Sequence, residues 1–282
     1  MTLSVKPERP VDAVVIDVLR AVDAAARELD IAYFVAGAMA RDIVLTHVLG
    51  FETGRATRDI DLAVRISSWD RYTALKDALA ATGEFTFGRG VPQRMHHWSG
   101  YPVDFIPFGD FADADGTFGW PPGHEVVMNV TGYVEGLEGA IRVDLGSGHV
   151  IPVASPAALA MLKLFAWLDR GRRDRKDAQD LLLLLRRYAD TIDARVLHAD
   201  DAGILLEVGY DFERASPRLL GRHIRELAAP ATVLRLRQSL GPDRVRNDLA
   251  IDMARDLAHL DDPVATAHRL LIDFIAGLTS SR

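Results

Sequence analysis

The hydrophobic periodicity of the chain changes near Ala154, and this change constrains the fold more than any other feature. Before it, helical and strand-like patterns alternate along the chain. After Ser155 and Pro156, a pair typical of a helix start, the apolar spacing is almost entirely helical. The sequence therefore predicts an α/β (α+β) domain over residues 1–154 and an all-helical domain over residues 155–282.

The first part of the chain predicts helix, strand, helix, strand and helix in turn. Apolar residues at helical spacing cover 11–29, and IAYFVAG is typical of a buried strand that ends at Gly37. A helix over AMARDIVLTHVL follows, and then the alternating strand RDIDLAVRI. The next helix would be capped by Ser67 and Asp70 and would reach about Ala81.

Short alternating segments fill residues 84–153. We interpret EFTFG, RMHHW, PVDFIPF, EVVMNV, AIRVDL and HVIPV as strands of a twisted, largely antiparallel extension of the sheet, joined by glycine-containing hairpins. The stretch GDFADADGTFGWPPG predicts an irregular loop. His96 and His97 are adjacent, so they would face opposite ways on a strand, which favours a structural or surface role over shared metal binding.

Composition limits the classes of protein. The 282 residues are 49% hydrophobic, enough for one large or two moderate cores. A net charge of −7 argues against bulk attraction to nucleic acid and leaves a local basic patch open. The chain has no cysteine, which excludes disulfides and thiolate metal sites. Without a signal-peptide pattern or a membrane-length apolar run, we expect a soluble cytoplasmic protein.

Asp59 and Asp61 form the most informative pair of residues. On a strand they project to one side, while Ile60, Leu62 and Val64 face the core. Two neighbouring carboxylates favour a cation between them, and Mg²⁺ or Mn²⁺ with substrate phosphates suits such oxygen ligands. The pair therefore predicts a metal site for phosphoryl or nucleotidyl transfer. Taken alone, an Asp-x-Asp on a strand more often marks a solvent-exposed face than a metal site.

Two further features support a nucleotide site. Gly37 and Ala38 open a helix directly after a strand, and a helix start presents free N–H groups to phosphate. The alternative is an ordinary tight turn, but Arg41 and the nearby acid pair favour nucleotide binding. Asp104 would join the acid pair if its strand lies beside that of Asp59; it could then bind a second metal and help deprotonate an acceptor hydroxyl. Its alternative is an edge-strand acid.

Two of these motifs, taken together, resemble those of a known superfamily. FVAGAMARD followed by TRDIDLAV resembles the polymerase-β nucleotidyltransferase superfamily, in which a Gly-Gly or Gly-Ser turn precedes Asp-x-Asp. The fuller resemblance is to the AbiEii-like nucleotidyltransferase toxins of type IV toxin–antitoxin systems. RATRDID supplies the Arg-x-Thr element with Arg55 and Thr57, and a later helix supplies Lys163, Arg170 and KDAQDL. The resemblance covers roughly residues 31–185.

The resemblance implies a nucleotidyltransferase-like domain with a mixed, twisted sheet and a helical domain that completes the substrate cleft. It implies Mg-dependent transfer of NMP from an NTP to an acceptor hydroxyl, with pyrophosphate release. Lys163 would reach the triphosphate, and Asp177 would orient the substrate or that lysine. The expected catalytic residues are Asp59, Asp61, Asp104, Lys163 and Asp177, with the first three as metal ligands.

The nucleotide-binding set follows from the same motifs. Ala38 departs from the family pattern, because alanine offers the phosphate no hydroxyl and leaves only a backbone N–H. We expect Gly37, Ala38, Arg41, Thr57, Arg58 and Lys163 to contact the nucleotide.

For some of these charged residues, an ordinary structural or solvent-exposed role is the alternative to a functional one. Lys163 borders an apolar helical stripe, where lysine more often extends to solvent. The basic run DRGRRDRKD could hold an RNA phosphate or simply be solvated. Lys176 and Asp180 have the spacing of a helix-surface pair.

The acceptor and the partners stay open. The family suggests RNA, such as a tRNA 3′ end, or a protein hydroxyl, together with a restraining antitoxin. An aminoglycoside-type small molecule is the alternative acceptor, since the chain is acidic. A non-catalytic nucleotide-binding regulator is the third hypothesis, against which the intact acid pair argues.

Overall fold

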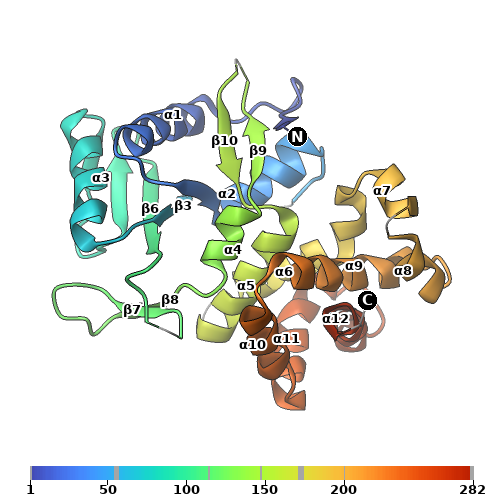
Figure 1. Ribbon diagram of the computed structural model, residues 1–282. Helices are drawn as coiled ribbons and strands as arrows, with labels where there is room; N and C mark the ends of the chain where they lie inside the picture. The colour runs from blue at the N-terminus through green and yellow to red at the C-terminus, as the bar shows by residue number, and fades with distance from the viewer. Residues whose placement is uncertain are drawn as a thin grey trace. The chain divides into compact units, whose positions relative to one another are not determined.

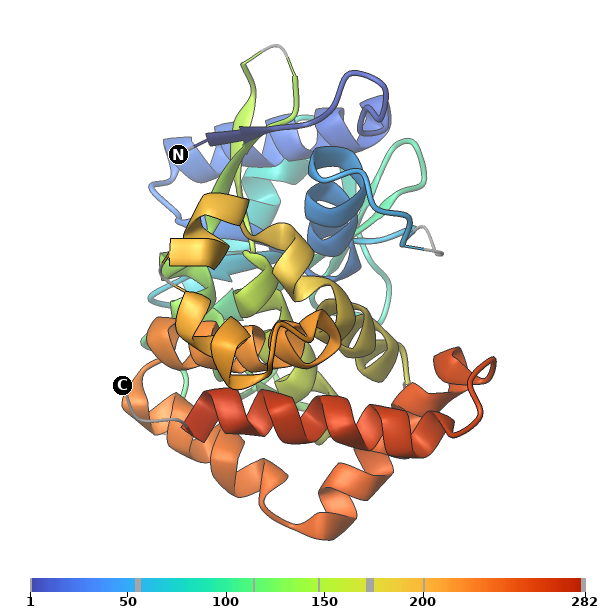
Figure 2. The same ribbon diagram turned by 90° about the vertical axis from the view of Figure 1, so that its right-hand side faces the viewer.

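A computed structural model describes residues 2–53, 57–113, 115–146, 148–170, 175–199 and 201–279. The chain forms two compact units, Met1–Ser155 and Pro156–Arg282 (Figures 1 and 2). Among the helices in these ranges, none combines the length and the apolar character that crossing a membrane requires.

The N-terminal unit is built on a mixed eight-stranded sheet with the order β1-β9-β10-β2-β3-β6-β5-β4 (Figure 1). β2 is antiparallel to β3, and β3 is parallel to β6. The predicted mixed sheet is thus confirmed. Its strands are β1 (Thr2–Ser4), β2 (Tyr33–Ala36), β3 (Ile60–Arg65), β4 (Phe85–Phe87), β5 (Arg94–His97), β6 (Pro102–Phe108), β9 (Ile141–Asp144) and β10 (Val150–Val153).

The alternation of residue types along β3 explains which of its faces is buried. Ile60, Leu62 and Val64 are fully buried, as the sequence predicts, whereas Asp61 is half-buried on the other side of the strand. β5 shows the same alternation: His97 is buried against Ser99, with 2.8 Å between Nδ1 and Oγ, and His96 is half-buried on the opposite side.

Helices connect and cover the strands. They are α1 (Ala13–Glu28), α2 (Gly37–Arg41), the π-helical η1 (Asp42–Val48), α3 (Trp69–Ala81) and α4 (Tyr133–Glu138). α2 and η1 are continuous, so the helix predicted over AMARDIVLTHVL is present but widens into a π-helix, a form often found at functional sites. α3 is capped by Ser68 instead of Ser67, since the Ser68 hydroxyl accepts from the backbone N–H of Arg71.

The prediction of an irregular loop over residues 109–123 was wrong in part. The segment expected to be an irregular loop contains β7 (Thr117–Gly119), which pairs with β8 (Val127–Asn129) in a separate two-stranded sheet. Aromatic packing stabilises this hairpin: the Phe118 and Trp120 rings each lie 5.6 Å from the Trp69 ring of α3. Glycine-rich composition concealed these contacts, and it also concealed α4.

Every regular element described in the second unit is a helix. They are α5 (Pro156–Arg170), α6 (Lys176–Arg187), η3 (Tyr188–Thr191), α7 (Ala194–Ala199), α8 (Ala202–Glu207), α9 (Phe212–Leu227), α10 (Pro230–Leu240), α11 (Asp243–Ala254), η4 (Arg255–Leu257) and α12 (Pro263–Thr279).

Helices α9 and α12 approach each other closely at two glycines. A Cβ atom on Gly277 would lie 2.0 Å from the carbonyl oxygen of Arg218, and one on Gly221 would lie 2.1 Å from that of Phe274. The buried Asp273 adds an ion pair across the same contact, 2.8 Å from Arg218. Hydrogen in place of a side chain is what allows the two backbones to touch.

Candidate active site

Three charged side chains lie in one row across three neighbouring strands. Asp61 of β3 is in register with Asp104 of β6, and Asp104 is in register with Arg94 of β5. Residues paired across adjacent strands project to the same face. The expectation that the Asp104 strand lies beside the strand of the acid pair is therefore confirmed, and the row has an arginine at its end.

Arg94 binds both carboxylate oxygens of Asp104. Its Nε donates to Oδ1 at 2.7 Å, and Nη2 donates to Oδ2 at 2.6 Å. These hydrogen bonds raise the pKa of the Arg94 guanidinium above its usual range. Burial opposes this rise, and the charges of Asp104, Asp59 and Asp61 add to it. Arg94 is therefore a fixed positive charge among three carboxylates.

The glycine turn lies against the carboxylate of Asp61. Ala36, the last residue of β2, is paired with Asp61, and Gly37 follows with a positive φ of 61°. A Cβ atom on Gly37 would lie 1.8 Å from Oδ2 of Asp61. Only glycine satisfies both the left-handed backbone and this approach. Gly37 and Ala38 are half-buried at the start of α2, so the turn predicted to bind phosphate adjoins the acid pair.

A chain of hydrogen bonds links the same helix to Asp59. The hydroxyl of Thr57 donates to Oδ1 of Asp59 at 2.6 Å, and the backbone N–H of Thr57 donates to Oδ2 of Asp42 at 3.2 Å. Oδ1 of Asp42 accepts from Nε and Nη2 of Arg41 at 2.9 and 2.7 Å. The helix that begins at Gly37 thereby orients the first acid of the pair.

These contacts change the interpretation of two predicted nucleotide-binding residues. Arg41 is only 1% exposed and its guanidinium binds Asp42, because one helical turn after Gly37 the side chain points into the unit. The hydroxyl of Thr57 binds Asp59. Arg58 is exposed, whereas Arg55 of the Arg-x-Thr element lies outside the described residues.

In the helical unit, Lys163 is held between two carboxylates. Its Nζ lies 3.1 Å from Asp177 Oδ1 and 2.7 Å from Asp180 Oδ2. Burial lowers the pKa of Lys163, but the two carboxylates outweigh it and leave the pKa raised, so the lysine stays charged. The alternative in which Lys163 extends to solvent is wrong, because its side chain is 12% exposed.

The neighbours of Lys163 are buried as well. Asp177 also forms an ion pair with Arg170 at 3.1 Å, so its carboxylate orients both Arg170 and Lys163. Asp180 is 2% exposed, which corrects its interpretation as a helix-surface residue. Residues 171–174, the centre of the basic run expected to contact RNA, lie outside the described residues.

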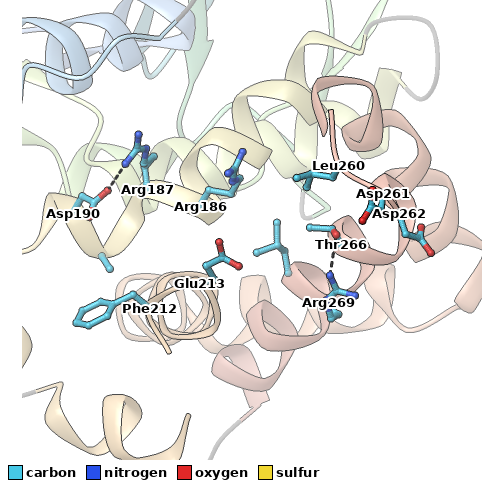
Figure 3. A pocket seen from close by; sticks show the side chains of 12 residues that line it. Arg186, Arg187, Asp190, Phe212, Glu213, Leu260, Asp261, Asp262, Thr266 and Arg269 are labelled. Carbon is cyan, nitrogen blue, oxygen red and sulfur yellow. Dashed lines mark hydrogen bonds and ion pairs between the residues drawn. The ribbon is translucent and has the colours of Figure 1, made fainter. Parts of the chain in front are cut away.

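A separate pocket of about 650 Å³ lies within the helical unit (Figure 3). Figure 3 shows Arg187 paired with Asp190, and Arg269 with Thr266, at 3.1 and 2.9 Å. Both basic and acidic side chains line it, so its charge favours neither an anion nor a cation. Its lining consists of Arg186, Arg187, Ala189, Asp190, Phe212, Glu213, Leu260, Asp261, Asp262, Thr266, Arg269 and Leu270.

A nucleotidyltransferase is the class of protein that this sheet, turn and acid pair define, and comparison with known families agrees. The family model described as "Nucleotidyl transferase AbiEii toxin, Type IV TA system" matches residues 22–266. The chain therefore belongs to the AbiEii nucleotidyltransferase family. A search of curated proteins gave no match.

Several solved structures are similar to this chain at low identity. The antibiotic-resistance factor ANT(2″)-Ia is 15% identical, with 71% of this chain and 97% of that chain covered and a TM-score of 0.38. A nucleotidyltransferase-like protein from Paracoccidioides brasiliensis is 17% identical, with 70% and 94% covered and a TM-score of 0.39. The Thermotoga maritima CCA-adding enzyme complexed with tRNA is 13% identical, with 96% and 82% covered and a TM-score of 0.28. At these values the structures do not identify the substrate of this chain.

Proposed function

We propose that this enzyme transfers a nucleoside monophosphate from an NTP to a hydroxyl of RNA, with release of pyrophosphate, and depends on Mg²⁺ or Mn²⁺. The observation that carries the proposal is the contact between the Gly37 turn and the carboxylate of Asp61. In the proposed enzyme this contact would bring the phosphate-binding turn and the metal-binding carboxylates together, where β2 ends and β3 begins.

The residues of the N-terminal unit have the donor chemistry that such a metal requires. Among the residues that the structure describes, no group of three or more histidine or acidic side chains is arranged to hold a metal ion. Asp59 and Asp61 nevertheless offer carboxylate oxygens, and Mg²⁺ is commonly held by one or two carboxylates together with substrate phosphates. A bound cation would neutralise charge on the triphosphate.

The residues of the chain then have distinct roles. Backbone N–H groups at Gly37 and Ala38 would bind a phosphate, and the exposed Arg58 could contact the nucleotide. We propose that Lys163 contributes positive charge to phosphate binding, with Asp177 holding its ammonium group in place. Membership of the AbiEii family supports these roles, because Lys163 and Asp177 lie within residues 22–266, which the family model matches.

The acceptor and the partner follow from the family and not from the site itself. We favour RNA, with a tRNA 3′ end as the first candidate, and a cognate antitoxin as the partner that restrains the enzyme. The net charge of −7 favours one other acceptor, a small polar molecule of the aminoglycoside type.

A labelled-transfer assay tests this proposal. The protein is incubated with Mg²⁺, total RNA and each α-labelled NTP in turn, and parallel reactions contain an aminoglycoside mixture in place of RNA. We expect label from one NTP to enter a tRNA-sized band and to be lost when EDTA is added. Label in the aminoglycoside alone would replace the RNA proposal, and the absence of transfer to RNA, aminoglycoside or protein despite NTP binding would contradict enzymatic function.

Thr57 provides a test of how the acid pair is positioned. Replacing Thr57 with valine keeps its shape but removes the hydroxyl that binds Asp59. We expect the metal concentration for half-maximal activity to rise about 10- to 100-fold, the usual cost of losing a hydrogen bond to a metal ligand. Thr57→Ser should restore most of the affinity, whereas Thr86→Val, at an exposed position of β4, should change nothing. Equal metal affinity in Thr57→Val and the wild type would contradict the positioning role.

A further inference from the structure

We propose that Arg94 supplies the second positive charge of the active site, so that the enzyme works with one metal ion, bound by Asp59 and Asp61. Asp104 would then hold Arg94 in place of the metal-binding and proton-accepting roles that the sequence predicts for it. The inference rests on the proposed nucleotidyltransferase function and specifies how its site balances charge.

The geometry of the ion pair is the first reason. Two parallel N–H···O contacts of 2.7 and 2.6 Å are short, charge-assisted hydrogen bonds, and they occupy both oxygens of Asp104. The Asp104 side chain is also only 12% exposed. Each oxygen keeps a further lone pair. A metal ion approaching it would be repelled by the bound guanidinium, and separating the pair would leave a mostly buried carboxylate to be solvated again.

Backbone hydrogen bonds hold Arg94 and its neighbours on both sides. They fix the position from which the Arg94 side chain reaches Asp104. The carbonyl of Arg94 accepts from the N–H of Gly88 at 2.9 Å, and its own N–H donates to Val91 at 3.0 Å. Gly88 lies so close that a Cβ atom there would be 2.9 Å from the Cβ of Arg94. On the other side, the N–H of Phe105 in β6 donates to the carbonyl of Gln93 at 2.9 Å.

The hydrogen-bonding capacity of Arg94 is the second reason. Arg94 has five N–H donors, of which Asp104 uses two, and its side chain is 32% exposed. The remaining donors are therefore available to phosphate oxygens, for which the planar guanidinium is well suited.

The test counts metal ions instead of relying on activity. Mn²⁺ bound per chain is measured by electron paramagnetic resonance and equilibrium dialysis, with a non-hydrolysable NTP analogue present at saturation. We expect one Mn²⁺ in the wild type and two in Arg94→Gln, because the substitution frees Asp104 to bind metal. Asp104→Asn should still bind one, and the exposed Arg89→Gln serves as the matched arginine control.

The number of bound Mn²⁺ ions either supports or overturns the inference. Two Mn²⁺ in the wild type, one in Arg94→Gln, or fewer than one in Asp104→Asn would overturn the inference while leaving the transferase proposal intact. A wild type that binds the NTP analogue but no Mn²⁺ would contradict the proposed metal dependence itself. Circular dichroism and thermal unfolding establish that each variant is folded before its metal is counted.

Discussion

Replacing Asp61 with asparagine should reduce nucleotidyl transfer at least about 1,000-fold. A bound cation contributes several kcal/mol of transition-state stabilisation, and each 1.4 kcal/mol corresponds to about tenfold in rate. The asparagine side chain would keep the volume over Gly37 but not the charge that binds the cation. Initial rates of label transfer at saturating NTP and Mg²⁺ measure the effect.

The fold of Asp61→Asn should be intact. Asp61 is half-buried, and the substitution removes one of several neighbouring negative charges without creating a cavity. We expect its circular dichroism spectrum to match that of the wild type. Asp110→Asn, at an exposed position just after β6, provides the matched control and should retain full activity. An Asp61→Asn enzyme with wild-type turnover would refute the site.

Replacing Gly277 with alanine should destabilise the helical unit by about 3 kcal/mol. The added methyl group would lie 2.0 Å from the carbonyl oxygen of Arg218. This neighbour is helix backbone and cannot rotate away, so α9 and α12 must separate and lose packing, a cost at the upper end of those seen for overpacked cores. Hydrogen exchange of the α12 amides in the native state measures the loss.

A second glycine controls for backbone effects in that experiment. Gly203 lies in α8, and a Cβ atom there meets nothing within 4 Å. Gly203→Ala should therefore be neutral or stabilise the unit by up to about 1 kcal/mol, because alanine favours helix. If Gly277→Ala had the same protection factors as the wild type, the close contact of α9 with α12 would be wrong.

Local patterns were sufficient to predict much of the N-terminal unit. The alternation around Asp61 predicted which face of β3 is buried, and the pattern around Asp104 predicted the strand that carries this acid, whose place beside β3 the structure then showed. Both rest on the two-residue repeat of a strand, which tertiary contacts seldom override. The glycine at position 37 was informative for a similar reason, since a strand that turns directly into a helix demands an unusual backbone.

The positions of two arginines and one lysine depend on contacts with acidic side chains that no local pattern contains. Arg94 meets Asp104 only through the register of β5 on β6, which the intervening turn sets. Arg41 was expected to contact the nucleotide, yet its guanidinium is buried against the adjacent Asp42. The sequence did not show that Lys163 would be held inside the helical unit by the carboxylate of Asp180.

The row of Asp61, Asp104 and Arg94 has a consequence for how the sheet assembles. Slippage of β3 by one residue would exchange its two faces and place Asp61 where Ile60 and Leu62 are now fully buried. An unpaired carboxylate in that environment is strongly disfavoured. The residues proposed for catalysis thus also disfavour incorrect strand register during folding. A sheet with β3 out of register would bury a carboxylate, whereas the sheet in native register leaves the acids accessible to substrate.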